Sequence, residues 1–328
     1  MNRLKNIDIL KIIGLLCIIL AHVEPNGIIF QLRNFDVVLM IMISSYLFII
    51  NNDKNKSKID CKYLIKRIKR LLIPTWIFLV IFFIISKTFT NYSLKAIIHS
   101  FLLHEGIGYV WVIRIYLMVA VLLPILVPML KKKYSYLVII ILYIIYEISA
   151  QIGIFNINII MADIIAYIIP TILIIAVTYW VSNNKEKKIV IFSLINFLIF
   201  ILCGLIIYKL TGKIENTNYM KYPFRIYYLS YAFFISTILI LITRIKVVTD
   251  LLYNKFVEII SKSSLWIYLW HILFVILIKT VYPNLNWIIK YICVLGLSIS
   301  ITYIQNKMLD IFEKKKNINK EIFSIFRG

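Results

Sequence analysis

Ionisable side chains stand inside or at the ends of long apolar stretches of this sequence, where burial in lipid would be costly. His22 ends the first apolar stretch, and Asp36 opens the second. A carboxylate near an imidazole can orient the ring and raise its basicity, so the two side chains together suit general-base chemistry. The alternatives are that His22 contacts lipid headgroups and that Asp36 caps the start of its helix.

The first stretch also carries two charged side chains near its start. Lys11 precedes His22 by about three helical turns, which places both side chains on one face of a helix. Asp8 lies one turn before Lys11 and can pair with it. The pattern fits either a polar face that leads to His22 or an ion pair that anchors the helix at the membrane surface.

A basic segment over residues 66–70 precedes the third apolar stretch. Its Arg67 and Arg70 project together from a helix, and Lys66 adds a further positive charge. Two guanidinium groups on one face suit the recognition of phosphate. Anchoring at a cytoplasmic surface, with contact to anionic lipid, explains the same residues without a ligand.

The fourth apolar stretch contains Arg114, one helical turn after Trp111. A buried arginine needs an anionic partner. Four carboxylates are predicted in the same outer half of the protein: Glu24, Asp36, Glu147 and Asp163. With His22 they predict either a polar cavity on that side or a structural network of ion pairs.

One polar stripe runs along the ninth apolar stretch. Ser264, Tyr268 and His271 recur at helical spacing, so they share one face of the helix. The stripe predicts either part of a site or hydrogen bonds between neighbouring helices.

The composition indicates a membrane protein. Hydrophobic residues make up 62% of the 328 residues and the mean hydropathy is +0.90, whereas soluble domains hold about 45–50% apolar residues. These values exclude a disordered chain, a collagen-like repeat and a disulfide-rich module, and they argue against a water-soluble enzyme. Basic residues outnumber acidic residues by 37 to 15. Such an excess suggests nucleic acid binding in a soluble protein, but in a membrane protein it marks the cytoplasmic loops.

The sequence lacks the common patterns for metal, nucleotide and redox chemistry. The cysteines form no CxxC pair and have no metal-ligand spacing, so they are predicted to be free thiols: Cys17, Cys61, Cys203 and Cys293. We find no P-loop, GxSxG, HExxH or Rossmann glycine pattern.

The apolar runs predict an all-α membrane bundle of about ten transmembrane helices. The predicted spans are 7–23, 34–50, 71–88, 107–130, 134–152, 158–181, 188–209, 226–243, 263–281 and 286–306. Most of the 37 basic residues fall on one side of this arrangement, which predicts that both termini are cytoplasmic. The exception is the segment 209–225, whose basic residues fall on the outer side. It is either a basic patch for an anionic acceptor or the sign of a miscounted span.

We expect one integral membrane domain over residues 1–328, with a basic cytoplasmic loop at 51–70 and a basic cytoplasmic tail at 307–328. A cleavable signal is not predicted, because Lys11 interrupts the first apolar run and no small-x-small cleavage site follows it.

Several of these segments, in this order, resemble the acyltransferase-3 family of integral membrane acyltransferases. The similar segments extend over most of the chain: Arg3 to Lys11, Ala21-His22, Asn34 to Val37, Ser44 to Phe48, Arg67-x-x-Arg70 with Leu71 to Pro74, Trp111-x-x-Arg114, and Ile267 to His271. The details are most similar to bacterial members that O-acetylate capsular or other surface polysaccharides. Two positions depart from the family pattern. Lys11 stands where arginine is frequent and keeps the charge without the bidentate fork, and Ser45 stands where glycine is frequent.

The resemblance implies that acetyl-CoA is the co-substrate and that His22 is the essential histidine. His22 is expected to deprotonate an acceptor hydroxyl, aided by Asp36 or Glu24. The residues expected to bind CoA are Lys11, Lys66, Arg67 and Arg70. The pantetheine arm would then thread between helices toward the outer half of the protein. The residues expected to bind substrate are Trp111, Arg114, Tyr268 and His271.

The sequence therefore predicts an O-acetyltransferase of the bacterial cytoplasmic membrane that modifies a cell-surface polysaccharide or its lipid-linked precursor. Its expected partners are acetyl-CoA, the glycan acceptor and the lipid bilayer, with no metal and no nucleic acid. Direct transfer and an acetyl-enzyme relay are both open. The alternative is a transporter or flippase of charged glycolipids without acyl chemistry, and a third class is a catalytically silent membrane scaffold.

Overall fold

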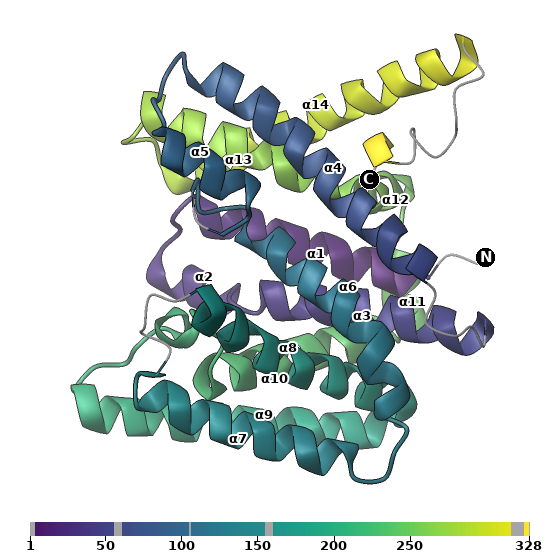
Figure 1. The fold of residues 1–328 in the computed structure, drawn as a ribbon, viewed down its shortest axis with the longest axis vertical. Helices are drawn as coiled ribbons and strands as arrows, with labels where there is room; N and C mark the ends of the chain where they lie inside the picture. The colour runs from purple at the N-terminus through teal and green to yellow at the C-terminus, as the bar shows by residue number, and fades with distance from the viewer. Residues whose placement is uncertain (1–3, 56–60, 105, 155–159, 316–324, 328) are drawn as a thin grey trace. The chain divides into compact units, whose positions relative to one another are not determined.

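The computed structural model describes residues 4–55, 61–104, 106–154, 160–315 and 325–327, which form helices and no strands (Figure 1). The all-α prediction is confirmed. Isoleucine-rich runs favour strands in water, but lipid offers no partners for open strand edges, so the apolar runs form helices.

A helix occupies each of the ten predicted spans. The α-helices are α1 (Lys5–His22), α2 (Gly27–Leu32), α3 (Asp36–Asn55), α4 (Cys61–Ser86), α5 (Leu94–Phe101), α6 (Trp111–Met129), α7 (Ser135–Gln151), α8 (Ile160–Asn183), α9 (Glu186–Thr211), α10 (Ile226–Ile242), α11 (Lys246–Leu252), α12 (Lys255–Lys262), α13 (Ser264–Val281) and α14 (Trp287–Lys315). A 3-10 helix, η2 (Thr217–Met220), precedes α10.

Among the described residues, seven helices are long and apolar enough to cross a membrane. An eighth is added if α10 and α11, which meet at 91°, are one broken span. The other two predicted spans are α1, whose first half carries Lys5, Asp8 and Lys11, and α7, whose 17 residues are at the lower limit for a span.

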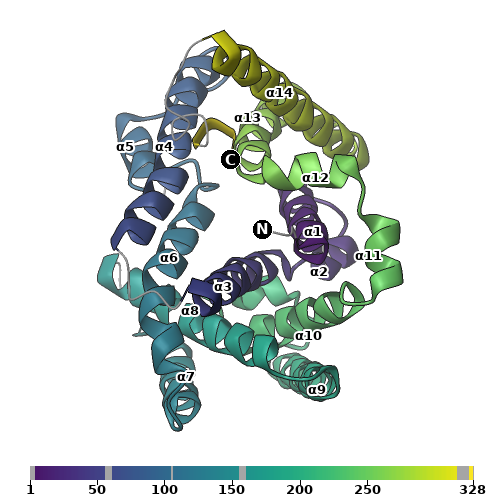
Figure 2. The same cartoon turned by 90° about the vertical axis from the view of Figure 1, so that its right-hand side faces the viewer.

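The described chain divides into two compact units. Unit 1 comprises Met1–Asn26, Lys62–Leu117 and Asp250–Gly328. In this unit α1 packs against α12, α13 and α14, and α13 lies beside α14 (Figure 2). Helix α13 is buried on almost every side from Trp266 to Leu273, which is the pattern of a central helix. Helix α4 joins this packing through an edge-to-face contact between Phe78 and Trp270, whose ring centroids are 5.8 Å apart.

Unit 2 comprises Gly27–Cys61 and Met118–Thr249. Here α10 packs against α9 and α3, and α8 packs against α3 and α7. Helix α7 shows how the sequence sets this packing, because Ile139, Tyr143 and Tyr146 recur at helical spacing and are buried.

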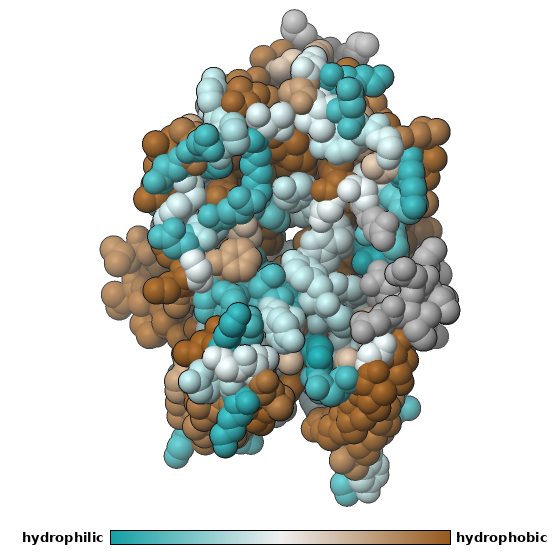
Figure 3. All heavy atoms as spheres, turned by 90° about the vertical axis from the view of Figure 1, so that its left-hand side faces the viewer, coloured by the Kyte–Doolittle hydropathy of each residue, from teal (hydrophilic) through white to brown (hydrophobic). Residues whose placement is uncertain are grey.

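The rest of the α7 surface is apolar and exposed. Its exposed residues include Leu137, Val138, Ile140, Ile141, Ile144, Ile145 and Ile148. Helix α9 presents a similar surface, with Val190, Ile191, Leu194, Ile195, Leu198 and Leu202. In Figure 3, the outer sides of the two lower lobes, where these helices lie, are mostly brown, with teal and white patches on their inner sides and tips. Apolar faces of this extent suit contact with lipid.

Four predicted helix ends differ most from the structure. Helix α3 continues to Asn55 and α4 begins at Cys61, so helix occupies much of the predicted basic loop at 51–70. Helix α14 continues to Lys315, into the predicted tail at 307–328. Charged residues end an apolar run but not a helix, because lysine and arginine have good helix propensity. Helix α6 begins at Trp111 rather than at 107, so Arg114 lies in its first turn.

Candidate functional site

Two histidines from distant parts of the sequence meet in unit 1. His22 is the last residue of α1, and His271 lies near the middle of α13, where it is fully buried. The Nδ1 atom of His22 lies 2.9 Å from Nε2 of His271, which is a hydrogen-bond distance. The two rings are nearly parallel, with an interplanar angle of 14°. The structure therefore brings together two residues that the sequence placed in separate roles.

Two tyrosines hold this pair. The backbone carbonyl of Tyr268 contacts Nδ1 of His271. The Tyr268 hydroxyl donates to the backbone carbonyl of Tyr109 over 2.5 Å. The Tyr109 ring meets the His22 ring edge to face, with centroids 4.7 Å apart. The predicted polar stripe on this helix thus makes hydrogen bonds between elements, which was one of its two expected uses.

The loop that carries Tyr109 is set by a serine and a glycine. Ser100 donates to the carbonyl of Ala96 over 2.7 Å and accepts from the backbone N–H of Ile107 over 3.0 Å. Gly106 has a φ of +83°, and a Cβ at this position would lie 2.1 Å from the Ser100 hydroxyl oxygen. Only glycine satisfies both the backbone angle and the close approach.

Glu24, two residues beyond His22, forms an ion pair with Lys279 over 2.5 Å. The hydrogen bond from Lys279 lowers the pKa of Glu24, with a further contribution from the charge of Lys290. Burial raises the pKa of Tyr109, and the charge of Glu24 adds to this shift. Glu24 is therefore an ionised carboxylate near the histidine pair at neutral pH.

Trp111 and Arg114 lie in the first turn of α6, directly after the Tyr109 loop. Both side chains are partly buried. Tyr109, whose ring contacts His22, is therefore followed closely by Trp111 and Arg114 in the part of α6 that belongs to unit 1.

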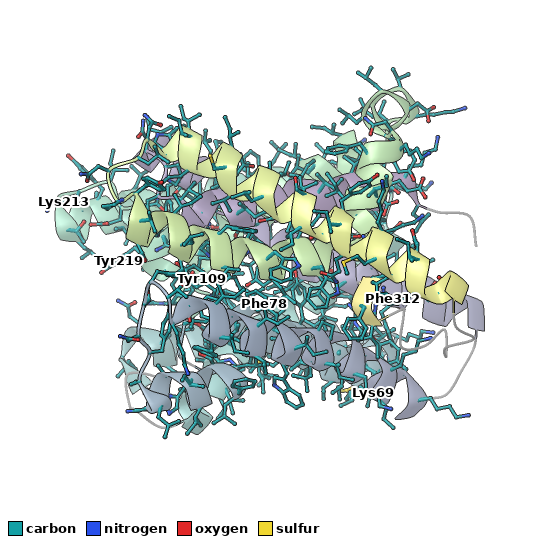
Figure 4. The ribbon with its side chains drawn as sticks, turned by 90° about the horizontal axis from the view of Figure 1, so that it is seen from above. Lys69, Phe78, Tyr109, Lys213, Tyr219 and Phe312 are labelled. Carbon is teal, nitrogen blue, oxygen red and sulfur yellow. The ribbon has the colours of Figure 1, made fainter. Side chains whose placement is uncertain are left out.

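The predicted phosphate-binding residues lie at the other end of unit 1. Lys66, Arg67 and Arg70 are on the first turns of α4, where Lys62 and Lys69 add two more positive charges. In Figure 4, Lys69, Phe78 and Tyr109 follow one another from right to left, so this basic end lies away from the Tyr109 end. Arg70 precedes Phe78 by about 12 Å along the helix. Phe78 in turn contacts Trp270, the neighbour of His271.

Near the start of α1, Asp8 is buried and accepts a hydrogen bond from Ser261 of α12 over 2.5 Å. Lys11 lies one turn later and is partly buried. Asp8 thus joins α1 to α12, a contact that the sequence did not predict.

Asp36 lies in unit 2, within a buried cluster of charges. Arg33 donates to one Asp36 carboxylate oxygen over 2.9 Å, and Lys221 donates to the other over 3.1 Å. These three side chains are at most 4% exposed. Lys221 also donates to Asn34 over 2.9 Å, and burial lowers the pKa of Lys221 to about 8. A catalytic role for Asp36 stays a prediction, and the contacts show a carboxylate that holds two cations.

The basic segment 209–225 has a structural explanation. Lys221 is buried against Asp36, and Arg225 forms an ion pair with Glu147 over 3.0 Å. Only Lys209 and Lys213 of its four basic residues are exposed. The segment connects α9 to α10 close to the predicted boundaries, and two of its four basic residues are used in ion pairs. The side chain of Asp163 lies outside the described residues.

Sequence reasoning missed several residues of these two clusters. Tyr109 has no distinguishing spacing, and its contact with His22 depends on the loop conformation. Lys279 follows His271 by about two helical turns, so its position near the C-terminal end of α13 is predictable from the sequence. Lys221 belongs to the segment 209–225, whose basic residues fall on the side opposite to most others, and that discordance is the available sequence signal for an internal ion pair.

Comparison with known protein families gives one match. A family model described as an acyltransferase domain of type 3 matches residues 4–305, which is nearly the whole chain. No curated protein and no solved structure matches this chain.

Proposed function

The chain belongs to the acyltransferase-3 family, and on this premise we propose that it transfers an acetyl group from acetyl-CoA to a hydroxyl of a cell-surface polysaccharide or its lipid-linked precursor. It is a multi-pass membrane protein, and we place it in the bacterial cytoplasmic membrane. The observation that carries the proposal is the hydrogen bond between His22 and His271. It fixes the position of the His22 imidazole, a candidate general base, within a largely apolar helix bundle.

The basic end of α4 is the proposed binding site for the CoA phosphates. Arg67 and Arg70 lie one helical turn apart, and Lys66 is beside them. Guanidinium forks match phosphate oxygens, and the ammonium groups add unspecific attraction. From Arg70 the helix leads over about two turns to Phe78, which contacts the neighbour of His271. An extended pantetheine arm along α4 would therefore bring the thioester toward the histidine pair.

His22 is the proposed general base. Its imidazole takes the proton of the acceptor hydroxyl while the hydroxyl oxygen forms a bond to the acetyl carbonyl carbon. The bond from that carbon to the CoA sulfur breaks, and the imidazolium of His22 returns the proton to the leaving thiolate. Trp111, Arg114 and Tyr268 are the proposed substrate-binding residues, since they lie on the elements that follow or contact Tyr109. Assistance from Glu24 or Asp36 stays a prediction.

The first experiment measures binding of radiolabelled acetyl-CoA to the purified protein in detergent. We expect saturable binding by the wild type and loss of binding in Arg67→Ala/Arg70→Ala. The matched control is Lys62→Ala/Lys69→Ala, which removes the same charge from exposed positions at the same helix end. An equal loss of acetyl-CoA binding in the control would show that Arg67 and Arg70 act only through general electrostatic attraction. A folded wild type that does not bind acetyl-CoA would overturn the proposed donor.

The second experiment measures label transferred from acetyl-CoA to glycans in membranes that contain the protein. His22→Ala should reduce transfer by about 10²- to 10⁴-fold, the usual contribution of a general base. The variant should stay folded in the membrane, because His22 is the last residue of α1. Undiminished transfer would remove His22 from the chemistry, and a catalytically silent scaffold would show no transfer at all.

A glycolipid flippase would also account for the excess of basic residues, including those of the segment 209–225. Two residues of that segment, Lys221 and Arg225, are used in internal ion pairs. Acetyl-CoA binding separates the two functions, since a flippase has no need of this donor.

A further inference from the structure

We propose that His271 is a positioning residue that fixes the neutral tautomer of His22, so that the reactive lone pair of His22 lies on Nε2. This inference rests on the proposed function, in which His22 is the base. It assigns to His271 a role other than substrate binding, and it follows from the order of hydrogen bonds that runs from Tyr268 through His271 to His22.

The first step is the tautomer of His271. Its Nδ1 atom contacts the backbone carbonyl of Tyr268. A carbonyl oxygen can only accept a hydrogen bond, so Nδ1 of His271 must carry the hydrogen. The ring is fully buried on α13, where a charged imidazolium would lose its hydration, so the neutral form is favoured. A neutral imidazole has one N–H group, and Nε2 of His271 is therefore a lone-pair acceptor.

The second step assigns the tautomer of His22 from the tautomer of His271. The Nδ1 atom of His22 lies 2.9 Å from the Nε2 acceptor of His271, so it must donate its hydrogen. The lone pair of neutral His22 is then on Nε2. The opposite arrangement, in which His271 donates from Nε2, would point the lone pair of its Nδ1 at the Tyr268 carbonyl. That arrangement places two acceptors against each other in a buried site, and it is therefore disfavoured.

The third step is the benefit to the base. When His22 takes a proton on Nε2, its Nδ1–H becomes a charge-assisted donor to His271, and such hydrogen bonds are about twice as strong as neutral ones. In many sites a carboxylate orients the histidine and stabilises its protonated form, but that arrangement requires a buried anion. A neutral imidazole avoids that cost within an apolar helix bundle. Tyr109, edge-on to His22, supports the ring from a second direction.

The tautomer can be observed directly. The sequence has only 4 histidines, His22, His99, His104 and His271, so selective ¹⁵N-histidine labelling gives few signals in a detergent-solubilised sample. The signal that disappears in His22→Ala belongs to His22. In the wild type at a pH where this ring is neutral, we expect protonated Nδ1 and unprotonated Nε2. A protonated Nε2 on neutral His22 would overturn the proposal.

The variants separate positioning from packing. His271→Leu removes the acceptor and should leave His22 as a mixture of tautomers, with kcat for acetyl transfer reduced by about 10²-fold and KM for acetyl-CoA unchanged. The expected decrease in kcat lies between two known effects. One is the decrease caused by removing a partner that orients a histidine, and the other is the decrease seen when a catalytic histidine is held in the wrong tautomer. His271→Gln retains an acceptor oxygen and should restore part of kcat. Loss of kcat with an unchanged His22 tautomer would show that His271 acts through packing alone.

A further control tests the origin of the polarity. Tyr268→Phe removes the hydroxyl but keeps the backbone carbonyl that contacts His271, so the His22 tautomer should not change. A changed tautomer would overturn the order of hydrogen bonds argued here. The nitrogen signals require no substrate, so a wild type that fails to transfer acetyl groups refutes the proposed function while the signals still decide the tautomer of His22.

Discussion

Removal of Asp36 should damage unit 2 far more than removal of Lys221, although the two side chains are hydrogen-bonded to each other. Arg33, Asp36 and Lys221 together carry one negative and two positive charges in a buried site. Asp36→Asn leaves two buried cations without a carboxylate. Lys221→Met leaves a neutral pair of Arg33 and Asp36, and methionine can fill the space near the Tyr228 ring.

The magnitudes follow from burial and charge. Breaking a buried ion pair by loss of one partner costs about 3–5 kcal/mol when an uncompensated charge remains, and this value applies to Asp36→Asn. For Lys221, a pKa of about 8 compared with the ordinary lysine value of 10.5 corresponds to about 3 kcal/mol for keeping the ammonium charged in the fold. Lys221→Met avoids that cost but leaves the Asn34 acceptor unsatisfied, at about 1–3 kcal/mol. The two contributions nearly cancel.

The same cluster predicts a pH dependence. The folded-state pKa of Lys221 lies below its unfolded value, so above pH 8 the unfolded chain binds the proton that the folded chain has lost. The free energy of unfolding should therefore rise with pH, by up to about 1.4 kcal/mol per pH unit, between pH 8 and the onset of tyrosine ionisation near pH 10. Lys221→Met should abolish this rise.

The assay is thermal unfolding of the purified protein in one detergent, followed by the fluorescence of its tryptophans. Lys213→Met is the matched control, because Lys213 is exposed in the same connecting segment. We expect the order wild type, Lys213→Met and Lys221→Met at similar midpoints, with Asp36→Asn far below them. If Lys221→Met were as unstable as Asp36→Asn, Asp36 would need both cations as partners. That result would refute the view that Lys221 is an excess positive charge in the cluster.

Three further substitutions test the elements around the histidine pair. Gly106→Ala should lower both stability and acetyl transfer because its Cβ has no room, whereas Gly108→Ala, with a similar positive φ and open space, should cost less in a thermal unfolding comparison. Ser261→Ala should destabilise the protein by about 1.5–3 kcal/mol, the value for a hydrogen bond to the charged Asp8, and an unchanged unfolding midpoint would contradict this. Phe78→Ala should cost about 3–5 kcal/mol, seen in the same assay, because it leaves a cavity between α4 and α13.

The helices were predictable because hydropathy along the chain reports depth in lipid directly. A helix occupies every predicted span, and most ends agree within a few residues. The helix ends that differ most from the prediction fall where charge and helix propensity disagree. Lysines end an apolar run, and the predicted basic loop and tail began there, but the backbone continues as helix through α3 and α14.

The site was only partly predictable, because sequence spacing gives the depth of a side chain but not the helix that it faces. The sequence identifies His22 and His271 separately, each as a polar residue in an apolar stretch. Their contact depends on how α1 and α13 are rotated against each other, and no spacing within either helix contains that rotation. Asp36 shows the converse, since its depth suggested His22 as a partner and the described contacts are with Arg33 and Lys221.

The buried lysine also changes how the orientation prediction should be weighed. Counting basic residues by side assumes that each one faces water or headgroups, where its charge acts during membrane insertion. Lys221 is buried against Asp36, and Arg225 is neutralised by Glu147. The discordant segment 209–225 therefore retains two exposed basic residues, Lys209 and Lys213. Two of the four basic residues on the discordant side therefore have anionic partners inside the protein, and the cytoplasmic location of both termini stays a prediction.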